Sequence, residues 1–316
     1  MKKRYMFTIA IIIIAIMVIL FLVNVEFLKI YLALLIVLAL LLIVPFFIVD
    51  IQAKPPIRTI IQYNVKEEKF KNRKVFVITS KENKKSDKYI LYLHGGAYVM
   101  EATYKHWQFL EEIVDRTGMT LILPDYPLTP KNTYKEVFDM IEPLYKETIK
   151  KVGNENLIFM GDSAGGGMAL GLLQKIGEEN GVMPYKTILL SPWLDVTMTN
   201  PEIEEKEKVD PVLLKEALKI AGRHYAGIDG MESYLVNPIL GPVDKLKNIT
   251  IYTGTYDMLN PDVHKFIEKT KKLGVDIDLR EKKKAIHIWM THIENKNVYS
   301  AKETFEDIVK LLYEKG

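Results

Sequence analysis

The 316-residue sequence contains no cysteine, which excludes disulfide bonds, thiolate metal ligands and a cysteine nucleophile. It also lacks an excess of one charge, because 43 Lys and Arg residues stand against 40 Asp and Glu residues. No basic stripe with interleaved aromatic residues is present, so we expect no nucleic acid partner. Histidine is scarce, and no pair has the spacing of metal ligands. We therefore expect neither a metal ion nor a cofactor.

Apolar residues, in contrast, are concentrated at the N-terminus. Two apolar runs, residues 5–23 and 27–49, are separated by a short polar break. Each run is close to the roughly 20 residues that a helix needs to cross a bilayer. A signal peptide would have a shorter apolar region and a cleavage site instead of a second run. A buried helical hairpin of a soluble protein is the other alternative. We predict a two-span transmembrane hairpin over residues 1–50, with residues 5–49 as the membrane contact.

Basic residues flank this predicted hairpin on one side of the membrane. Lys2, Lys3 and Arg4 precede the first span, and residues 54–74 after the second span are rich in Lys and Arg, whereas only Lys29 is basic between the spans. Segments rich in Lys and Arg beside a membrane span usually stay on the cytoplasmic side. We therefore predict a cell-membrane protein whose termini and C-terminal domain face the cytoplasm. Residues 51–74 are predicted to be a basic juxtamembrane linker. That linker either rests on anionic lipid head groups or is simply solvated.

Beyond the linker, short apolar runs alternate with helical patterns. The predicted strands are residues 75–79, 89–93, 120–123, 157–160, 187–190, 249–253 and 276–280. The main predicted helices are residues 104–117, 133–151, 263–273 and 298–313, and Pro143 is expected to kink or divide the second of them. This alternation predicts an α/β fold over residues 75–316. Its sheet should be mainly parallel and covered by helices on both faces.

The segment Gly161-Asp162-Ser163-Ala164-Gly165 lies between a predicted strand and a helix-like stretch. A G-x-S-x-G pattern in this context is typical of a sharp nucleophile turn, in which small neighbours let the serine hydroxyl stand above the sheet edge. A phosphate-binding loop is the alternative, but the segment lacks the lysine of a P-loop and is not G-x-G-x-x-G. Ser163 is therefore the candidate nucleophile.

A second glycine-rich turn, His94-Gly95-Gly96-Ala97, follows the predicted strand 89–93. Its small residues can turn backbone N–H groups toward a serine nucleophile. Together with the N–H group of Ala164, those of Gly96 and Ala97 would form an oxyanion hole. A plain glycine turn after a strand is the alternative interpretation.

These two motifs resemble those of the hormone-sensitive-lipase-like branch of the α/β-hydrolase superfamily, which carries HGGG and GDSAGG. The similarity runs from the strand before HGGA to the C-terminus and includes residues 125–130 (DYPLTP) and 191–195 (SPWLD). Ala97 departs from the family's third glycine and narrows the space above the hole. Pro127 and Lys131 replace an arginine and a glutamate that are common in the family. The usual polar links of that loop are therefore in question.

The resemblance implies a Ser-His-Asp triad in the chain order serine, acid, histidine. Asp257 follows a predicted strand and matches the family's acid, with Asp262 and Glu268 as its rivals. His287 lies between the last predicted strand and the last helix, as the family's base does, and His292 is its competitor. A carboxylate just beyond a strand end points into the catalytic edge, which favours Asp257.

The implied chemistry is acyl transfer to water, in which Ser163 attacks a carbonyl, His287 takes its proton and Asp257 orients the imidazole. We predict a membrane-anchored carboxylic-ester hydrolase that acts on short-acyl esters, with a small-molecule or lipid-derived ester as substrate. An amidase or arylformamidase would use the same triad, and a ligand-binding pseudoenzyme is a more distant alternative. In the family a cap shapes the pocket, and here an insertion at about residues 196–237 should contribute to it.

Overall fold

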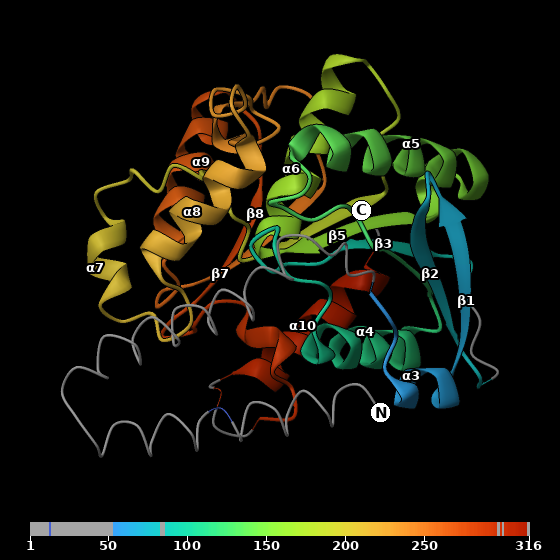
Figure 1. Ribbon diagram of the computed structural model, residues 1–316. Helices are drawn as coiled ribbons and strands as arrows, with labels where there is room; N and C mark the ends of the chain where they lie inside the picture. Colours follow the sequence, from blue (N-terminus) through green and yellow to red (C-terminus); the bar gives the residue numbers. More distant parts are fainter. Residues whose placement is uncertain (1–12, 14–52, 83–85, 296–297, 299, 315–316) are drawn as a thin grey trace. The chain divides into compact units, whose positions relative to one another are not determined.

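The computed structural model describes residue 13 and residues 53–82, 86–295, 298 and 300–314 (Figure 1). The chain divides into two compact units, Met1–Ile51 and Gln52–Gly316. Apart from Ile13, the predicted transmembrane hairpin lies outside the described residues. Within the described ranges, no helix is both long and apolar enough to cross a bilayer.

The second unit is built on an eight-stranded sheet with the order β1-β2-β4-β3-β5-β6-β7-β8. The strands are β1 Tyr63–Phe70, β2 Arg73–Ser80, β3 Tyr89–Leu93, β4 Thr120–Pro124, β5 Leu157–Asp162, β6 Lys186–Leu190, β7 Ile249–Gly254 and β8 Asp278–Lys282. Strand β2 pairs antiparallel with β1 and β4, and all other pairs are parallel. The predicted α/β fold with a mainly parallel sheet is confirmed.

Helices cover both faces of this sheet. They are α3 Ile57–Gln62, α4 Tyr104–Thr117, α5 Tyr134–Val152, α6 Ser163–Glu178, α7 Ile203–Glu207, α8 Lys215–Ala226, α9 Asn260–Lys272 and α10 Ala301–Tyr313, with short 3-10 turns at Asn154–Asn156, Pro238–Leu240 and Trp289–Thr291. Helices α4 and α10 lie on one face, and α5, α6, α8 and α9 lie on the other (Figure 1). A separate apolar cluster fills each side. Every residue of β5 is buried, as expected for a parallel strand covered on both faces.

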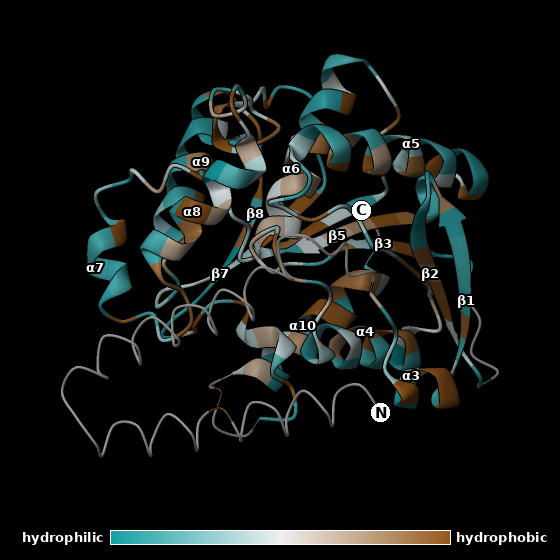
Figure 2. Ribbon diagram, in the orientation of Figure 1, coloured by the Kyte–Doolittle hydropathy of each residue, from teal (hydrophilic) through white to brown (hydrophobic). Residues whose placement is uncertain are grey.

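The prediction of a linker over residues 51–74 was wrong, because this segment contains α3 and β1. Strand β1 forms a hairpin with β2 in which Phe70 pairs with Arg73. The turn residues Lys71 and Asn72 have φ values of 44° and 63°, as a tight two-residue hairpin turn requires. The strand is hydrophilic along most of its length (Figure 2). Charged residues are common on edge strands, where they discourage further pairing, and here they conceal the strand pattern.

Pro143 does not divide α5, which runs continuously from Tyr134 to Val152. Proline has no N–H group, so the carbonyl of Asp139 one turn earlier loses its helical donor. The Lys71 Nζ atom donates to that carbonyl oxygen at 2.7 Å. The tip of the β1–β2 hairpin therefore replaces the hydrogen bond that the proline removes.

Helix α6 lies directly against β3, and this close approach depends on Gly165. A Cβ atom added there would lie 2.0 Å from the backbone oxygen of Leu93. No side chain can be accommodated without moving the helix away from the sheet. The glycine therefore brings the N-terminus of α6 beside the end of β3, where the two predicted motifs meet.

The predicted cap segment, residues 196–237, contains α7 and α8. The side chains of Leu218 and Tyr225 on α8 are buried, whereas Leu214 and Ile220 are 70% and 56% exposed. Only part of the apolar pattern in this segment therefore packs against the domain, and Tyr225 is its deepest aromatic contact.

Candidate active site

Ser163 occupies the sharp turn between β5 and α6. Its φ angle is 51°, in the left-handed region that ordinary residues disfavour, and its side chain is nearly buried. The strained turn is the one expected for a nucleophile between a strand and a helix N-terminus.

The structure brings Ser163, His287 and Asp257 together in one hydrogen-bonded chain. The His287 Nε2 atom lies 2.9 Å from Ser163 Oγ, and its Nδ1 atom lies 3.0 Å from Asp257 Oδ2. The serine follows β5, the aspartate follows β7 and the histidine follows β8. The parallel strands thus deliver the three side chains to the same edge of the sheet.

Asp257 also determines the state of the imidazole. A carboxylate beside Nδ1 favours a proton there, which leaves Nε2 free to accept the proton of Ser163. Burial by itself would lower the pKa of His287, but the charge and hydrogen bond of Asp257 outweigh burial and raise this pKa above its ordinary value. The second carboxylate oxygen of Asp257 accepts the Leu259 N–H at 2.9 Å, which holds the acid in place.

The rival residues lie in other environments. Asp262 Oδ1 accepts a hydrogen bond from Asn200 at 2.9 Å. The ring of His292 lies 3.2 Å from the Lys105 amino group. Neither residue joins the chain of hydrogen bonds from Ser163.

The loop that carries His287 is strained. Ile288, the next residue, has a φ angle of 44°, which is rare for a β-branched residue. Its N–H group donates to Ser191 Oγ at 3.2 Å. Ser191, at the end of β6, is also in the left-handed region, with a φ angle of 47°. The hydrogen bond between these two residues holds the loop of His287 against the end of β6. Such backbone strain is commonly concentrated at functional sites.

The glycine turn after β3 lies against the nucleophile. A Cβ atom added to Gly95 would lie 2.9 Å from Ser163 Cβ. Gly96, Ala97 and Tyr98 have consecutive positive φ angles of 119°, 52° and 64°. This conformation turns successive backbone N–H groups in a tight arc. The Gly95 N–H is already used within the protein, so the next two N–H groups are the candidate oxyanion donors from this turn.

Ala164, the third predicted donor, is in the first turn of α6. The N–H groups of a first helical turn have no partner within the helix. Its N–H is therefore suited to bind an anionic oxygen beside Ser163.

Asp162, the residue before Ser163, is a further candidate site residue that we did not predict from the sequence. Its carboxylate is fully buried and accepts three hydrogen bonds. Tyr92 Oη and the Gly95 N–H donate to Oδ1, each at 2.8 Å, and His106 Nε2 lies 3.1 Å from Oδ2. Burial alone would raise the pKa of Asp162, but His106 and the donated hydrogen bonds outweigh burial and lower it. Asp162 therefore ties the nucleophile turn to the glycine turn.

His106, on α4, is oriented by the helix cap that precedes it. The Thr103 N–H donates to His106 Nδ1 at 2.9 Å, so that nitrogen must be an acceptor. The proton is then on Nε2, where it is donated to Asp162. Sequence reasoning placed His106 simply within a helix, although its position three residues after a capping threonine was a usable signal.

His94 begins the glycine turn and is buried under it. Its ring stacks on Tyr126 with a centroid separation of 4.3 Å, and Tyr126 Oη donates to the His94 carbonyl oxygen. Burial and the nearby His106 lower the pKa of His94 to about 4, so the ring is neutral at physiological pH. It supports the turn as a packed ring and not as a charge.

The loop that lacks the family's usual arginine at Pro127 is held by an arginine from another strand. Arg73 of β2 donates through Nε to the Asp125 carbonyl oxygen at 2.8 Å and through its terminal nitrogen to the Tyr126 carbonyl oxygen at 3.2 Å. The same guanidinium lies 3.2 Å from the Asp125 carboxylate. The departure at Pro127 is therefore compensated by a residue about 50 positions earlier in the chain.

Aromatic rings connect the glycine turn to the cap segment. Tyr98 stacks on Tyr225 of α8, with ring centroids 3.6 Å apart, and on Trp193, with centroids 5.2 Å apart. All three side chains are buried. The position of the turn is thus coupled to that of α8.

A carboxylate from the same cap segment holds the acid loop. Asp210 Oδ2 accepts the Met258 N–H, immediately after Asp257, at 2.7 Å. Asp210 Oδ1 accepts the N–H groups of Val212 and Leu213. Burial, opposed by these hydrogen bonds and reinforced by the charge of Asp257, raises the pKa of Asp210. The cap segment therefore touches the site at both the acid loop and the glycine turn.

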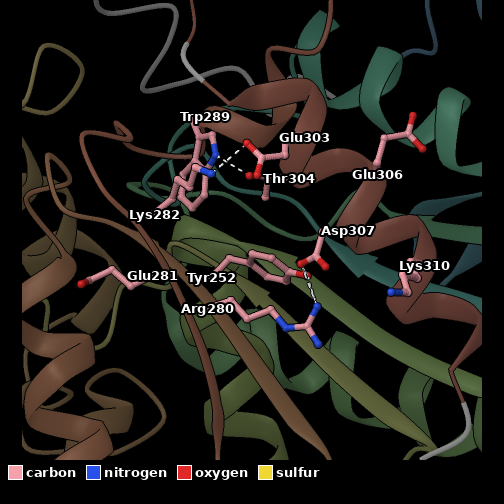
Figure 3. Close-up of a pocket in the computed structure, with 10 residues that line it drawn as sticks. All are labelled: Tyr252, Arg280, Glu281, Lys282, Trp289, Glu303, Thr304, Glu306, Asp307 and Lys310. Atoms are coloured by element: carbon pink, nitrogen blue, oxygen red, sulfur yellow. Dashed lines mark hydrogen bonds and ion pairs between the residues drawn. The ribbon is translucent and has the colours of Figure 1, made fainter.

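A hollow between β8 and α10 is lined by Tyr252, Arg280, Glu281, Lys282, Trp289, Glu303, Thr304, Glu306, Asp307 and Lys310 (Figure 3). Two ion pairs lie within it: Arg280 is 2.8 Å from Asp307, and Lys282 is 2.8 Å from Glu303. Ser163, Asp257 and His287 do not line it. This hollow is a charged surface groove separate from the triad.

Comparisons with known proteins identify the fold family. A family model described as alpha/beta hydrolase fold matches residues 90–291. An esterase of Acinetobacter venetianus is 30% identical over 193 residues, which are 60% of this chain and 64% of that protein. An acetyl-hydrolase of Streptomyces hygroscopicus is 24% identical over 203 residues, which are 63% of this chain and 67% of that protein. The aligned part therefore spans less than two-thirds of the Acinetobacter esterase.

Solved structures share the fold. The crystal structure of a candidate esterase from Staphylococcus aureus matches with a TM-score of 0.77 and 25% identity, covering 84% of this chain and 88% of that one. An esterase from the bacterial hormone-sensitive lipase family matches with a TM-score of 0.73 and 22% identity, covering 80% and 85%. The chain therefore belongs to the α/β-hydrolase fold family, and its HGGA and GDSAGG motifs resemble those of the hormone-sensitive-lipase-like branch.

Proposed function

We propose that the protein is a serine carboxylesterase that hydrolyses short-acyl esters. The observation that carries this proposal is the hydrogen-bonded chain from Ser163 through His287 to Asp257, at distances of 2.9 and 3.0 Å, beside a glycine turn. A serine needs a base, an orienting acid and donors for an oxyanion to act as a nucleophile, and this edge of the sheet supplies candidates for all three.

In the proposed mechanism, His287 Nε2 takes the proton of Ser163 as Oγ attacks the ester carbonyl carbon. The carbonyl oxygen becomes an oxyanion that accepts hydrogen bonds from the N–H groups of Gly96, Ala97 and Ala164. His287 then returns the proton to the leaving alcohol, which leaves an acyl-enzyme. Water, deprotonated by the same nitrogen, attacks the acyl-enzyme and releases the acid and Ser163.

Two features support a small acyl group. Ala97 adds a methyl group where the family's third glycine leaves open space, and the next residue, Tyr98, is held in a buried stack with Tyr225 and Trp193. The Streptomyces relative is an acetyl-hydrolase, which agrees with this expectation. Longer acyl chains should therefore react more slowly.

We also propose that residues 5–49 anchor the enzyme in the cell membrane as two spans, with the catalytic domain in the cytoplasm. The support is the length of the two apolar runs and the basic residues that flank them on one side. A membrane location would give the enzyme access to lipid-derived esters as well as soluble ones.

The nucleophile is tested by the variant Ser163→Ala. We expect the full chain, purified in detergent, to hydrolyse p-nitrophenyl acetate and butyrate faster than longer esters, and the variant to lose kcat by roughly six orders of magnitude. A fluorophosphonate should label the wild type and not the variant. Ser86→Ala, at the opposite end of β3, serves as the control. Folded wild-type protein with neither turnover nor labelling would contradict the proposed activity.

The acid is tested through pH dependence. Because His287 must be neutral to accept a proton and Asp257 raises its pKa, kcat/KM should fall as pH drops through a midpoint above about 6.5. Asp257→Asn should shift this midpoint to lower pH and reduce kcat by roughly four orders of magnitude. Asp262→Asn, the matched change at the rival acid, should leave the midpoint in place. A larger loss in Asp262→Asn than in Asp257→Asn would show that the acid is assigned incorrectly.

The role of Asp162 is tested by Asp162→Asn. The amide has only one acceptor oxygen, so it cannot accept both the hydrogen bond from His106 and those from Tyr92 and Gly95; the glycine turn should shift and kcat should fall by roughly 10- to 1,000-fold. Since Asp162 acts on the turn and not on the base, the acid midpoint of kcat/KM should not move. Tyr92→Phe removes only one of the three donors and should have a smaller effect. A folded Asp162→Asn protein with wild-type kcat would show that the carboxylate does not position the turn.

The anchor is tested with a reporter fused after Gly316 whose activity depends on its compartment. We expect the reporter to be active only on the cytoplasmic side, because the flanking basic residues favour that side. Activity restricted to the outer side would reverse the proposed orientation.

A further inference from the structure

Helix α3 exposes its apolar side to the surroundings and not to the core. Ile57, Ile60 and Ile61 are 76%, 53% and 66% exposed, whereas Thr59 is fully buried. At 100° per residue the three isoleucines occupy an arc of about 100°, centred roughly 150° from Thr59. In Figure 2 the helix is largely brown at the edge of the domain. A surface helix normally places its apolar stripe inward, so this orientation is reversed.

The opposite side of the helix is firmly attached to the domain. Thr59 Oγ1 donates to the Glu111 carboxylate on α4, and Tyr63 Oη, just after the helix, donates to Asp115. Lys81 Nζ donates to the Ile61 carbonyl oxygen at the helix C-terminus. These contacts fix the direction in which the isoleucines point. The three exposed isoleucines therefore form a fixed apolar face on the surface of the domain.

Basic side chains and an exposed tyrosine accompany this apolar face. Lys54 and Arg58 are exposed, and Arg58 lies 3.9 Å from Glu111. Tyr104, at the start of α4, is 52% exposed and interacts with Arg58. Apolar side chains bordered by Lys, Arg and Tyr are typical of surfaces that lie at the boundary between lipid acyl chains and head groups.

The segment that leads into α3 begins near the glycine turn. Ala53, four residues before α3, is buried and lies with His94 and Ala102 around one small cavity. The loop from the glycine turn to α4 exposes Val99 and Met100, which are 41% and 52% accessible. The segment before α3 therefore links the helix to the surroundings of the glycine turn.

We propose that α3 is an interfacial helix that docks the catalytic domain on an anionic lipid bilayer through Ile57, Ile60 and Ile61. The inference rests on the proposed membrane anchor. Only residues 50–56 separate the predicted second span from α3, and seven extended residues reach about 25 Å at most. Lys54 and Arg58 complement the anionic head groups of the cytoplasmic leaflet. The substrate class that follows is esters partitioned into the bilayer.

The absence of cysteine allows this docking to be measured directly. Single variants Ile57→Cys, Ile60→Cys and Ile61→Cys of the full chain would carry the fluorophore NBD in vesicles of phosphatidylcholine and phosphatidylglycerol. Val182→Cys and Leu273→Cys, at residues 57% and 62% exposed on other elements, are the controls. We expect lipids with a nitroxide on the upper acyl chain to quench the three α3 labels, and aqueous iodide to quench the two controls.

Two results would overturn the proposal. Quenching of the α3 labels by iodide to the same extent as the controls would show that the helix faces water. Protection of these labels from both quenchers would show that protein covers the face, either residues 1–50 or a second copy of the chain. The measurement needs no turnover, so it remains interpretable if the proposed esterase activity fails.

The functional consequence has a separate readout. A triple variant with Ile57→Ser, Ile60→Ser and Ile61→Ser should hydrolyse a vesicle-embedded ester several-fold more slowly, while its kcat/KM for soluble p-nitrophenyl acetate stays unchanged. Equal rates of the variant and the wild type on the embedded ester would overturn the proposed route of the substrate. A loss on both esters that accompanies a lower unfolding temperature would be a folding defect, in which case the fluorescence measurement decides.

Discussion

The Asp162 carboxylate carries a buried charge between the two turns on which the site depends. It precedes the nucleophile on β5, and it accepts hydrogen bonds from Tyr92 and Gly95 of the β3 segment and from His106 of α4. A buried charge is tolerated only where donors surround it. The same hydrogen bonds that satisfy Asp162 therefore hold β3, the glycine turn and α4 at a defined distance from Ser163. Without this charge, the hydrogen bonds that fix the glycine turn relative to the turn of Ser163 would be weakened.

Several residues with a strained backbone conformation lie at the same edge of the sheet. Ala97, Tyr98, Ser163, Ser191 and Ile288 all have positive φ angles. Each such residue costs on the order of 1–3 kcal/mol, and it persists only because the surrounding packing determines its position. The buried parallel strands and the two apolar clusters provide that packing. The rigid sheet thus allows an arrangement of backbone that short segments could not maintain alone.

The cap segment is joined to this edge at two points. Tyr225 stacks on Tyr98 behind the glycine turn, and Asp210 accepts a hydrogen bond from the residue after Asp257. Movement of the cap segment would therefore displace both the glycine turn and the loop of Asp257. In contrast, α3 is attached to α4 on the other face of the sheet from α8 (Figure 1).

Much of the sheet and of the site could be predicted because their signals are local. Strands β2 to β7 contain short apolar runs, and Ser163, Gly96, Ala97 and Ala164 lie in motifs whose small residues are required by sharp turns. Strand β1 escaped prediction because the charges of an edge strand mask its alternation. The continuity of α5 through Pro143 depends on Lys71, a donor from a distant hairpin.

The sequence by itself determined the strand and helix alternation, the nucleophile turn and a short set of candidate acids and bases, since these follow from residue type and spacing. Asp257 and His287 were already favoured by their positions, but only the tertiary structure places His287 between Ser163 and Asp257 and gives Asp262 and His292 other partners. It alone revealed that Asp162 and His106 support the glycine turn. The physical reason is that a hydrogen bond requires two atoms to lie within a few tenths of an ångström of its ideal length of about 2.9 Å. Residues more than 50 positions apart reach such distances only through the packing of the whole sheet.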